Sequence, residues 1–131
     1  MIADTNAVIR ILQGDTQAID HVATIEENHG YLHMSAVTEF ELYHSIERVN
    51  NPEERLSRIK AVVESKPTYS ADSTVMRKAG RIDGRLTANG NEIGVNNTVI
   101  AATALVHEEA ILTEDTDHFE RVDGLTVESY I

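Results

Sequence analysis

Apolar residues recur along this chain in two alternating patterns. Short uninterrupted apolar runs predict strands, and apolar residues spaced three or four positions apart predict amphipathic helices. The predicted strands cover residues 1–3, 31–34, 67–70, 110–113 and 125–127. The predicted helices cover residues 5–12, 16–27, 35–47, 52–64, 72–88 and 96–106. Strands that alternate with helices favour an α/β fold, in which helices cover both faces of a parallel sheet.

Polar residues at the starts of these segments predict where several helices begin. Ser35 and Asp72 are good N-cap residues, because their side-chain oxygens can accept a hydrogen bond from a free backbone N–H. Asn51, followed by proline and two acids, is typical of a helix start. Either Asn96 or Asn97 is expected to cap the helix that runs to residue 106.

Length and composition narrow the class of protein. The 131 residues make one domain, and a hydrophobic content of 41% argues against a disordered chain. No apolar run approaches the roughly 20 residues that cross a bilayer, and the first residues do not resemble a signal peptide. The chain has no cysteine, which excludes disulfides and thiolate metal sites. A cytoplasmic protein without a membrane partner is therefore expected.

The charge of the chain is unusual for its size. Eleven Lys and Arg residues stand against 22 Asp and Glu residues, a net charge of −11. Such a charge opposes nonspecific attraction to nucleic acids, which depends on cationic side chains. An acidic surface that is poor in lysine is also expected of a halophilic protein, because molar salt shortens the Debye length to about 3 Å.

Acidic residues follow two of the predicted strands. Asp4 follows the first strand and Asp115 follows the fourth, so both are expected at the edge where parallel strands end and where α/β proteins place their sites. Together with Glu41, Asn97 and Asp117 they offer the oxygen ligands that Mg²⁺ prefers. A purely structural interpretation stays open for each of them. Asp4 and Asn97 can cap helices, a helical Glu41 is exposed by default, and the other two acids can form turns.

Four segments resemble the sequence motifs of the PIN-domain ribonucleases, in the order and at the spacing of that family. These segments are Ile2–Ile9, Ser35–Leu42, Ile93–Ala102 and Leu112–Leu125. Within the family they are similar to the VapC toxins of type II toxin–antitoxin modules. The resemblance implies a three-layer α/β/α PIN-like domain over residues 1–131, with a short parallel sheet of four to five strands.

The resemblance also implies an activity and a set of site residues. The activity is that of an endoribonuclease that depends on Mg²⁺, with Mn²⁺ as a possible substitute. The residues implied in metal binding and catalysis are Asp4, Glu41, Asn97 and Asp115, with Asp117 as a further metal ligand. Thr5 and Asn6 would support the first ligand and Thr113 would orient the last. The implied partners are an RNA substrate, a VapB-type antitoxin and a second copy of the chain.

Position 97 departs from the family pattern. The family has a metal-binding aspartate there, and this chain has Asn97, which keeps the shape of the side chain but replaces an anionic oxygen with a neutral amide. Whether by design or by natural change, we expect the substitution to weaken or abolish nuclease activity and Asn97→Asp to restore it. The alternative is a catalytically dead PIN-fold binding module that acts through its antitoxin partner.

Three arginines recur every four residues in the predicted helix 72–88. Arg77, Arg81 and Arg85 therefore share one helix face. This face is either a solvated surface paired with acids such as Asp83 or a ridge that contacts RNA phosphates, for which arginine is well suited. The two phenylalanines and four tyrosines are not clustered, so a base-stacking platform is not expected. Histidine spacing predicts no zinc site, and the absence of a glycine-rich phosphate loop argues against an NTPase.

Overall fold

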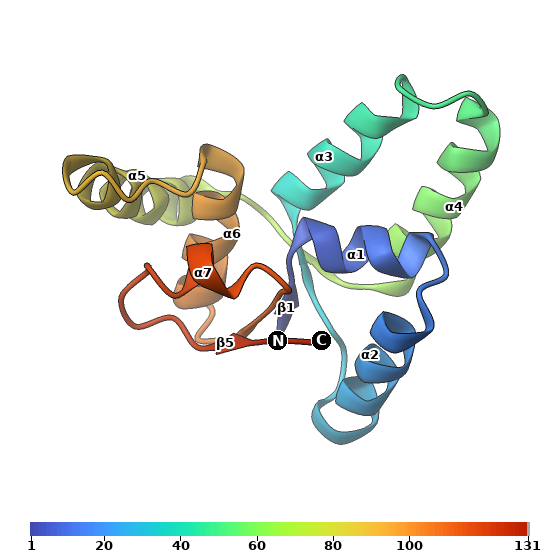
Figure 1. Cartoon of the computed structure of the whole chain (residues 1–131), viewed down its shortest axis with the longest axis horizontal. Helices are drawn as coiled ribbons and strands as arrows, with labels where there is room; N and C mark the ends of the chain where they lie inside the picture. Colours follow the sequence, from blue (N-terminus) through green and yellow to red (C-terminus); the bar gives the residue numbers. More distant parts are fainter. Residues whose placement is uncertain (131) are drawn as a thin grey trace.

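Short strands and longer helices alternate along residues 1–130, the part of the chain that the computed structural model describes (Figure 1). The strands are β1 (Ile2–Ala3), β2 (Met34–Ser35), β3 (Thr68–Tyr69), β4 (Ile111–Leu112) and β5 (Val127–Glu128). The helices are α1 (Thr5–Leu12), α2 (Thr16–His29), α3 (Ala36–Ile46), α4 (Pro52–Ser65), α5 (Ser73–Ala88), α6 (Val95–Val106) and α7 (Thr116–Phe119). Among these helices none is long and apolar enough to cross a membrane.

The strands form a small parallel sheet. β1 pairs with β4 and β4 pairs with β5, while β2 pairs with β3, and every pairing is parallel. A single parallel bridge between Ile2 and His33 joins the two groups. The resulting strand order is β3-β2-β1-β4-β5. The prediction of a short parallel sheet of four to five strands is confirmed.

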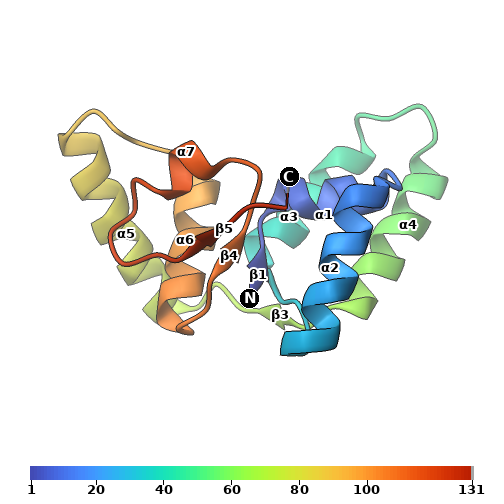
Figure 2. The same cartoon turned by 60° about the horizontal axis from the view of Figure 1, so that its bottom comes forward.

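Helices cover both faces of this sheet, as Figure 2 shows. Successive strand residues point to opposite faces. Ile2 and Ile111 pack into a core with α5, α6 and α7, whereas Ala3 and Leu112 pack into a second core with α1, α2, α3 and α4. The three-layer α/β/α arrangement therefore follows from the alternation within two-residue strands.

The helix starts agree with local capping chemistry except at α6. Side-chain oxygens of Asp4, Ser35 and Asp72 accept hydrogen bonds from the first turns of α1, α3 and α5. The prediction that Asn96 or Asn97 caps α6 is wrong, because Gly94 occupies the N-cap position and the helix begins at residue 95. Gly94 has a φ of 92°, a conformation that glycine adopts without steric penalty, so the chain turns into the helix before the asparagines.

Candidate functional site

The candidate site lies where β1 and β4 end side by side. Asp4 directly follows β1 and caps α1, and the segment that begins with Thr113 directly follows β4. The two strands are adjacent and parallel, with Ala3 opposite Leu112. The structure thus brings residues from the two ends of the sequence to one edge of the sheet.

Asp4 is a buried carboxylate with two internal hydrogen bonds. Its side chain is 2% exposed. Oδ1 accepts a hydrogen bond from the backbone N–H of Ala7 at 2.8 Å, and Oδ2 accepts one from the hydroxyl of Thr113. The pKa of Asp4 is raised to about 6, chiefly by burial and to a smaller extent by the charges of Asp115 and Glu114, against the lowering effect of the two hydrogen bonds. The folded protein therefore holds a proton on Asp4 more tightly than a solvated carboxyl group would.

The hydroxyl of Thr113 links the two strand ends. It donates to Asp4 and accepts a hydrogen bond from the backbone N–H of Asp115 at 2.8 Å. The Asp115 carboxylate then caps the short helix α7, and its Oδ2 lies 2.6 Å from Nδ1 of His118. Thr113 is fully buried, so this arrangement is shielded from competing water.

Glu41 is held at the start of α1 by a second threonine. The hydroxyl of Thr5 donates to Oε1 of Glu41 at 2.6 Å and lies 3.0 Å from the hydroxyl of Thr38. Glu41 is half-buried, which differs from the exposed position expected by default for a helical glutamate. We refer to Asp4, Glu41 and Asp115, with Thr5 and Thr113, as the acidic site.

Among residues 1–130, the other predicted site residues form none of the hydrogen bonds of this arrangement. Nδ2 of Asn97 donates to the carbonyl oxygen of Ile93 at 3.0 Å, within the start of α6. Asp117 is exposed on α7, and Asn6 is exposed on α1. Over residues 1–130, no three Asp, Glu, His or Cys side chains lie close enough together to hold a metal ion. Thr5 and His118 hold the carboxylates of Glu41 and Asp115 in separate contacts, which explains why the acids do not converge as predicted.

The acidic site fits a hard divalent cation in part. Mg²⁺ is usually held by one or two carboxylates together with water and substrate phosphate, so three converging side chains are not required. Asp4 provides a buried oxygen ligand beside the charges of Asp115 and Glu114. Asp4 and Asp115 are therefore candidate ligands for such an ion, and the described residues do not form a complete cage of protein ligands.

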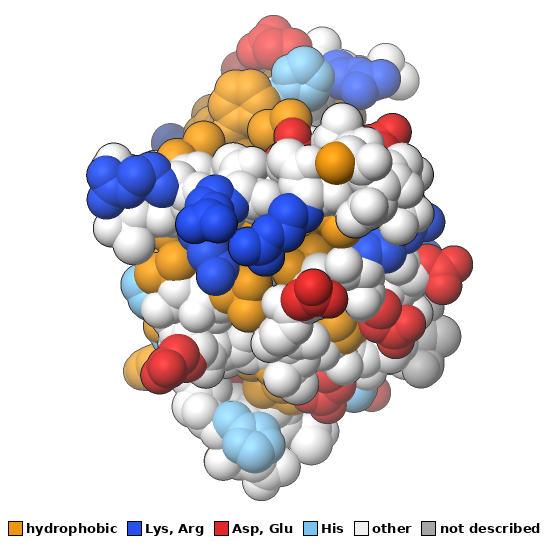
Figure 3. Space-filling view, turned by 90° about the vertical axis from the view of Figure 1, so that its left-hand side faces the viewer, with side chains coloured by type: hydrophobic (Ala, Val, Ile, Leu, Met, Phe, Trp, Pro, Cys, Tyr) orange, Lys and Arg blue, Asp and Glu red, His pale blue; other side chains and the backbone are white. Residues whose placement is uncertain are grey.

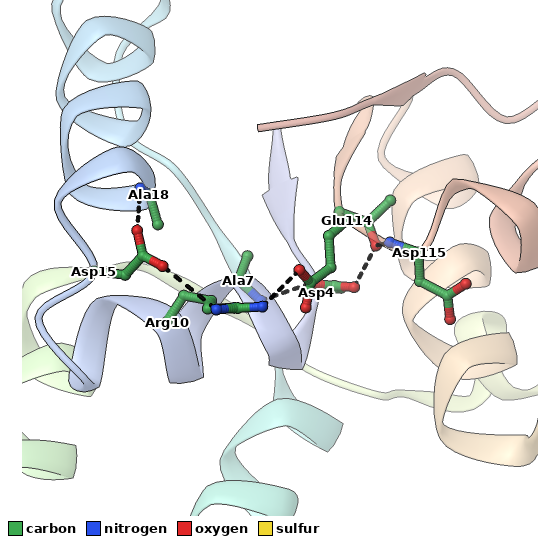
Figure 4. A network of polar contacts seen from close by, with 8 residues as sticks. Asp4, Ala7, Arg10, Asp15, Ala18, Glu114 and Asp115 are labelled. Carbon is green, nitrogen blue, oxygen red and sulfur yellow. Dashed lines mark hydrogen bonds and ion pairs between the residues drawn. The ribbon is translucent and has the colours of Figure 1, made fainter. Parts of the chain in front are cut away.

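Two contributors to the site were not predicted from the sequence. Arg10 extends between Asp15 and Glu114, with Nη2 of Arg10 lying 3.0 Å from Oε2 of Glu114 (Figure 4). This contact joins residues 104 positions apart, and nothing in the sequence indicates it. The contact of His118 with Asp115 has a possible signal in the sequence, because the two residues are three positions apart at the start of a helix.

The predicted arginine ridge lies on α5. Arg77, Arg81 and Arg85 are all exposed, and Lys78 is exposed beside them. None of these four takes part in an ion pair with another described residue, so the predicted pairing with Asp83 is not observed. Figure 3 shows basic side chains gathered on this face of the molecule.

Known proteins match the chain over nearly its whole length. The model of the PIN domain family matches residues 1–125. The tRNA(fMet)-specific endonuclease VapC of Shigella flexneri is 28% identical over 127 residues, covering 97% of this chain and 95% of the relative. Ribonuclease VapC2 of Haemophilus influenzae is 26% identical over 134 residues, covering 98% of this chain and 96% of the relative.

Solved structures share the fold at lower sequence identity. VapBC2 from Rickettsia felis, crystallised with a DNA fragment from its promoter, superposes with a TM-score of 0.89 at 17% identity, over 98% of this chain and 96% of that chain. VapBC-1 from nontypeable Haemophilus influenzae superposes with a TM-score of 0.85 at 23% identity, over the same shares of the two chains. At these identities the likeness establishes the fold alone.

Proposed function

Because this chain belongs to the PIN domain family, we propose that it is an endoribonuclease of the VapC type, the toxin of a VapBC-type toxin–antitoxin module. Relatives described as VapC ribonucleases match almost its whole length. The observation that carries the proposal is the buried Asp4 carboxylate, which the Thr113 hydroxyl joins to Asp115 at the ends of β1 and β4. We further propose that residues 1–131 form a single PIN domain that acts in the cytoplasm.

Asp4 and Asp115 would hold a divalent cation, Mg²⁺ or Mn²⁺. Glu41, Asn97 and Asp117 would be the remaining members of the metal-binding set. When bound, the cation would activate water and neutralise charge on the scissile phosphate. The raised pKa of Asp4 supports this assignment, because a bound cation would offset both the burial of the carboxylate and the nearby charges of Asp115 and Glu114.

The chain's own residues orient the acids before RNA arrives. The N–H of Ala7 and the hydroxyl of Thr113 fix the two oxygens of Asp4. The hydroxyl of Thr5 fixes the carboxylate of Glu41. Asn6, the next residue, is exposed in the first turn of α1. Pre-oriented carboxylates contribute to catalysis because they need no reorganisation as charge develops on the phosphate.

The activity of this chain depends on position 97. Asn97 supplies no negative charge, and its amide is already engaged with the Ile93 carbonyl oxygen. This contact favours the second candidate function, a catalytically dead binding module that acts through its antitoxin. Metal-dependent cleavage of labelled RNA by the chain and by its Asn97→Asp variant distinguishes the two functions, with EDTA as the control. Cleavage by neither protein supports the binding module.

We propose that the chain forms a homodimer and also binds a VapB-type antitoxin. Exposed Met76 and Val95 flank an apolar hollow between α5 and α6, which supports an interface with a second copy. Light scattering after size exclusion should give twice the 14.5 kDa chain mass, and Met76→Asp should reduce it to one chain. Tyr31→Asp, at an exposed apolar residue elsewhere, is the control and should leave the dimer intact. A single-chain mass for the unmodified protein would contradict the dimer.

We propose that the protein is halophilic. Most of its 22 acidic side chains take part in no ion pair among residues 1–130, which supports a surface that depends on screening by salt. The melting temperature should rise when KCl increases from about 0.1 M to about 1 M, because the Debye length falls from about 10 Å to about 3 Å. Circular dichroism measures this directly, and a maximum at low salt would refute it.

A further inference from the structure

A pocket with apolar walls and a cationic rim lies between α5, α6 and the segment after α7. Its apolar walls are Ile82, Leu86, Leu105 and Val122. Its rim carries Lys78, Arg85 and Arg121, together with the acid Asp123. We call it the α5 pocket. None of the residues that line it belongs to the acidic site.

The cations around the α5 pocket are free to bind a ligand. Lys78 and Arg85, like Arg77 and Arg81 farther along the helix face, form no ion pair with any residue from 1 to 130. Arg121 makes only two long contacts of 3.4 Å, both with backbone carbonyl oxygens. These five are exposed in a chain whose net charge is −11, and Figure 3 shows basic side chains gathered over apolar ones on this face.

The chemistry of the α5 pocket favours RNA over an acidic protein segment. Four of the five cations are arginines, whose planar guanidinium groups bind phosphates through two hydrogen bonds. The apolar lining around the half-buried Leu105 offers a small surface against which the face of a nucleobase can lie. Because the rest of the molecule repels a polyanion, RNA needs a local cationic surface to stay bound.

We propose that the α5 pocket is a second RNA-binding site, separate from the acidic site and resting on the proposed ribonuclease function. Lys78, Arg85 and Arg121 bind phosphates of an RNA segment that is not the one cleaved, and one nucleobase of this segment lies against the apolar lining around Leu105. Arg77 and Arg81 extend the phosphate contacts along α5. An RNA long enough to occupy both sites therefore binds more tightly than a fragment that fills only one.

The test is RNA binding measured by fluorescence anisotropy in EDTA, so that no cleavage occurs. The probes are a labelled tRNA-sized RNA and a labelled hexanucleotide. The measured quantity is the ratio of the affinity for the long RNA to the affinity for the hexanucleotide. For the double variant Arg85→Glu/Arg121→Glu we expect this ratio to fall by about tenfold or more. The slope of log affinity against log salt should also become less steep by about 1 to 2, as for the loss of two phosphate contacts.

A matched control separates the α5 pocket from overall charge. Arg48→Glu/Lys60→Glu reverses two exposed cations elsewhere and changes the net charge by the same amount. Equal losses in the two double variants, or no loss in either, would overturn the proposal. The proposal would also be overturned if the Arg85→Glu/Arg121→Glu variant kept its affinity for RNA but no longer bound a protein that the unmodified chain binds. The pocket would then be a protein-docking site.

The proposed function can fail separately from this inference. Metal-dependent cleavage by the Asn97→Asp variant tests the function, and it needs no α5 pocket when the substrate is the hexanucleotide.

Arg85→Gln/Arg121→Gln, which removes the charges without reversing them, should give an intermediate loss of affinity. Thermal melting of each variant verifies folding, and an unfolded charge-reversal variant leaves the glutamine pair to decide the outcome.

Discussion

Asn97→Asp should raise the rate of Mg²⁺-dependent RNA cleavage by about 100-fold or more, the range that a single well-placed charge-stabilising group contributes. The substitution would add an anionic oxygen to the proposed metal-binding set. It also removes the hydrogen bond from Nδ2 of Asn97 to the Ile93 carbonyl oxygen, because a carboxylate cannot donate. The new side chain then leaves that carbonyl and is available to the metal.

The stability of the Asn97→Asp variant should change little. Losing one hydrogen bond costs about 1 kcal/mol. A negative charge in the first turn of α6 regains part of this, since anions stabilise the N-terminus of a helix by about 0.3 to 1 kcal/mol. A change in cleavage rate can therefore be attributed to the site.

Asn96→Asp is the matched control for Asn97→Asp. It places the same charge one position earlier in α6, on a different side of the helix. Single-turnover cleavage of a labelled RNA should show the gain only for the variant at position 97, and EDTA should abolish it. Equal rates for the unmodified chain and both variants would remove position 97 from the metal-binding set.

Asp4→Asn should stabilise the metal-free protein above about pH 6 by roughly 3 kcal/mol. The folded pKa of Asp4 is about 6 and its ordinary value is 3.8, and each unit of difference corresponds to about 1.4 kcal/mol. A raised pKa means that the folded protein binds the proton more tightly than the unfolded chain. Asp4 therefore contributes stability below about pH 4 that is lost as pH rises through 6.

The Asp4→Asn variant keeps the local contacts that Asp4 makes. Its amide oxygen can still accept from the N–H of Ala7, and its amide nitrogen can donate to the hydroxyl of Thr113. Urea unfolding in EDTA between about pH 4 and pH 8 should give free energies of unfolding that are equal near pH 4, diverge as the pH rises to about 6 and stay apart above it. Asp117→Asn, at an exposed acid, should follow the unmodified chain.

Added Mg²⁺ should reverse the ranking of the two proteins. A ligand that binds only the folded state stabilises it in proportion to the logarithm of its concentration over Kd. The unmodified chain, or its Asn97→Asp variant if binding is weak, should gain stability, whereas chains with Asn at position 4 should not. A constant difference between the Asp4→Asn variant and the unmodified chain at every pH would show that Asp4 is not desolvated as the structure has it.

Local features of the fold could be predicted because their causes lie within a few residues. Asp72 accepts from Val75, three positions later, and such a cap can be recognised in the sequence. The placement of Asp4 and Asp115 after adjacent strands at one edge of the sheet was also predictable, since parallel strands end at one edge. The start of α6 was missed because the backbone conformation of Gly94, rather than a side-chain oxygen, sets it.

The internal contacts of the acidic site could not be predicted in the same way. Thr5 donates to Glu41, and Arg10 pairs with Glu114, across 36 and 104 positions of sequence. Which hydroxyl or guanidinium reaches which carboxylate depends on how α1, α3 and the end of β4 pack. The motif resemblance indicated which acids belong to the candidate site. It carried no information on whether their carboxylates lie close enough together to hold one metal ion.

The contact between Asp4 and Thr113 has a consequence for how the protein is made. It joins residues 109 positions apart, and β4, which precedes Thr113, is the strand between β1 and β5. During translation Asp4 leaves the ribosome long before its partner, and pairing of distant parallel strands is slow compared with helix formation. A nascent or prematurely terminated chain that lacks residue 113 cannot assemble the acidic site. Any activity that depends on the acidic site can therefore begin only after residue 113 has left the ribosome.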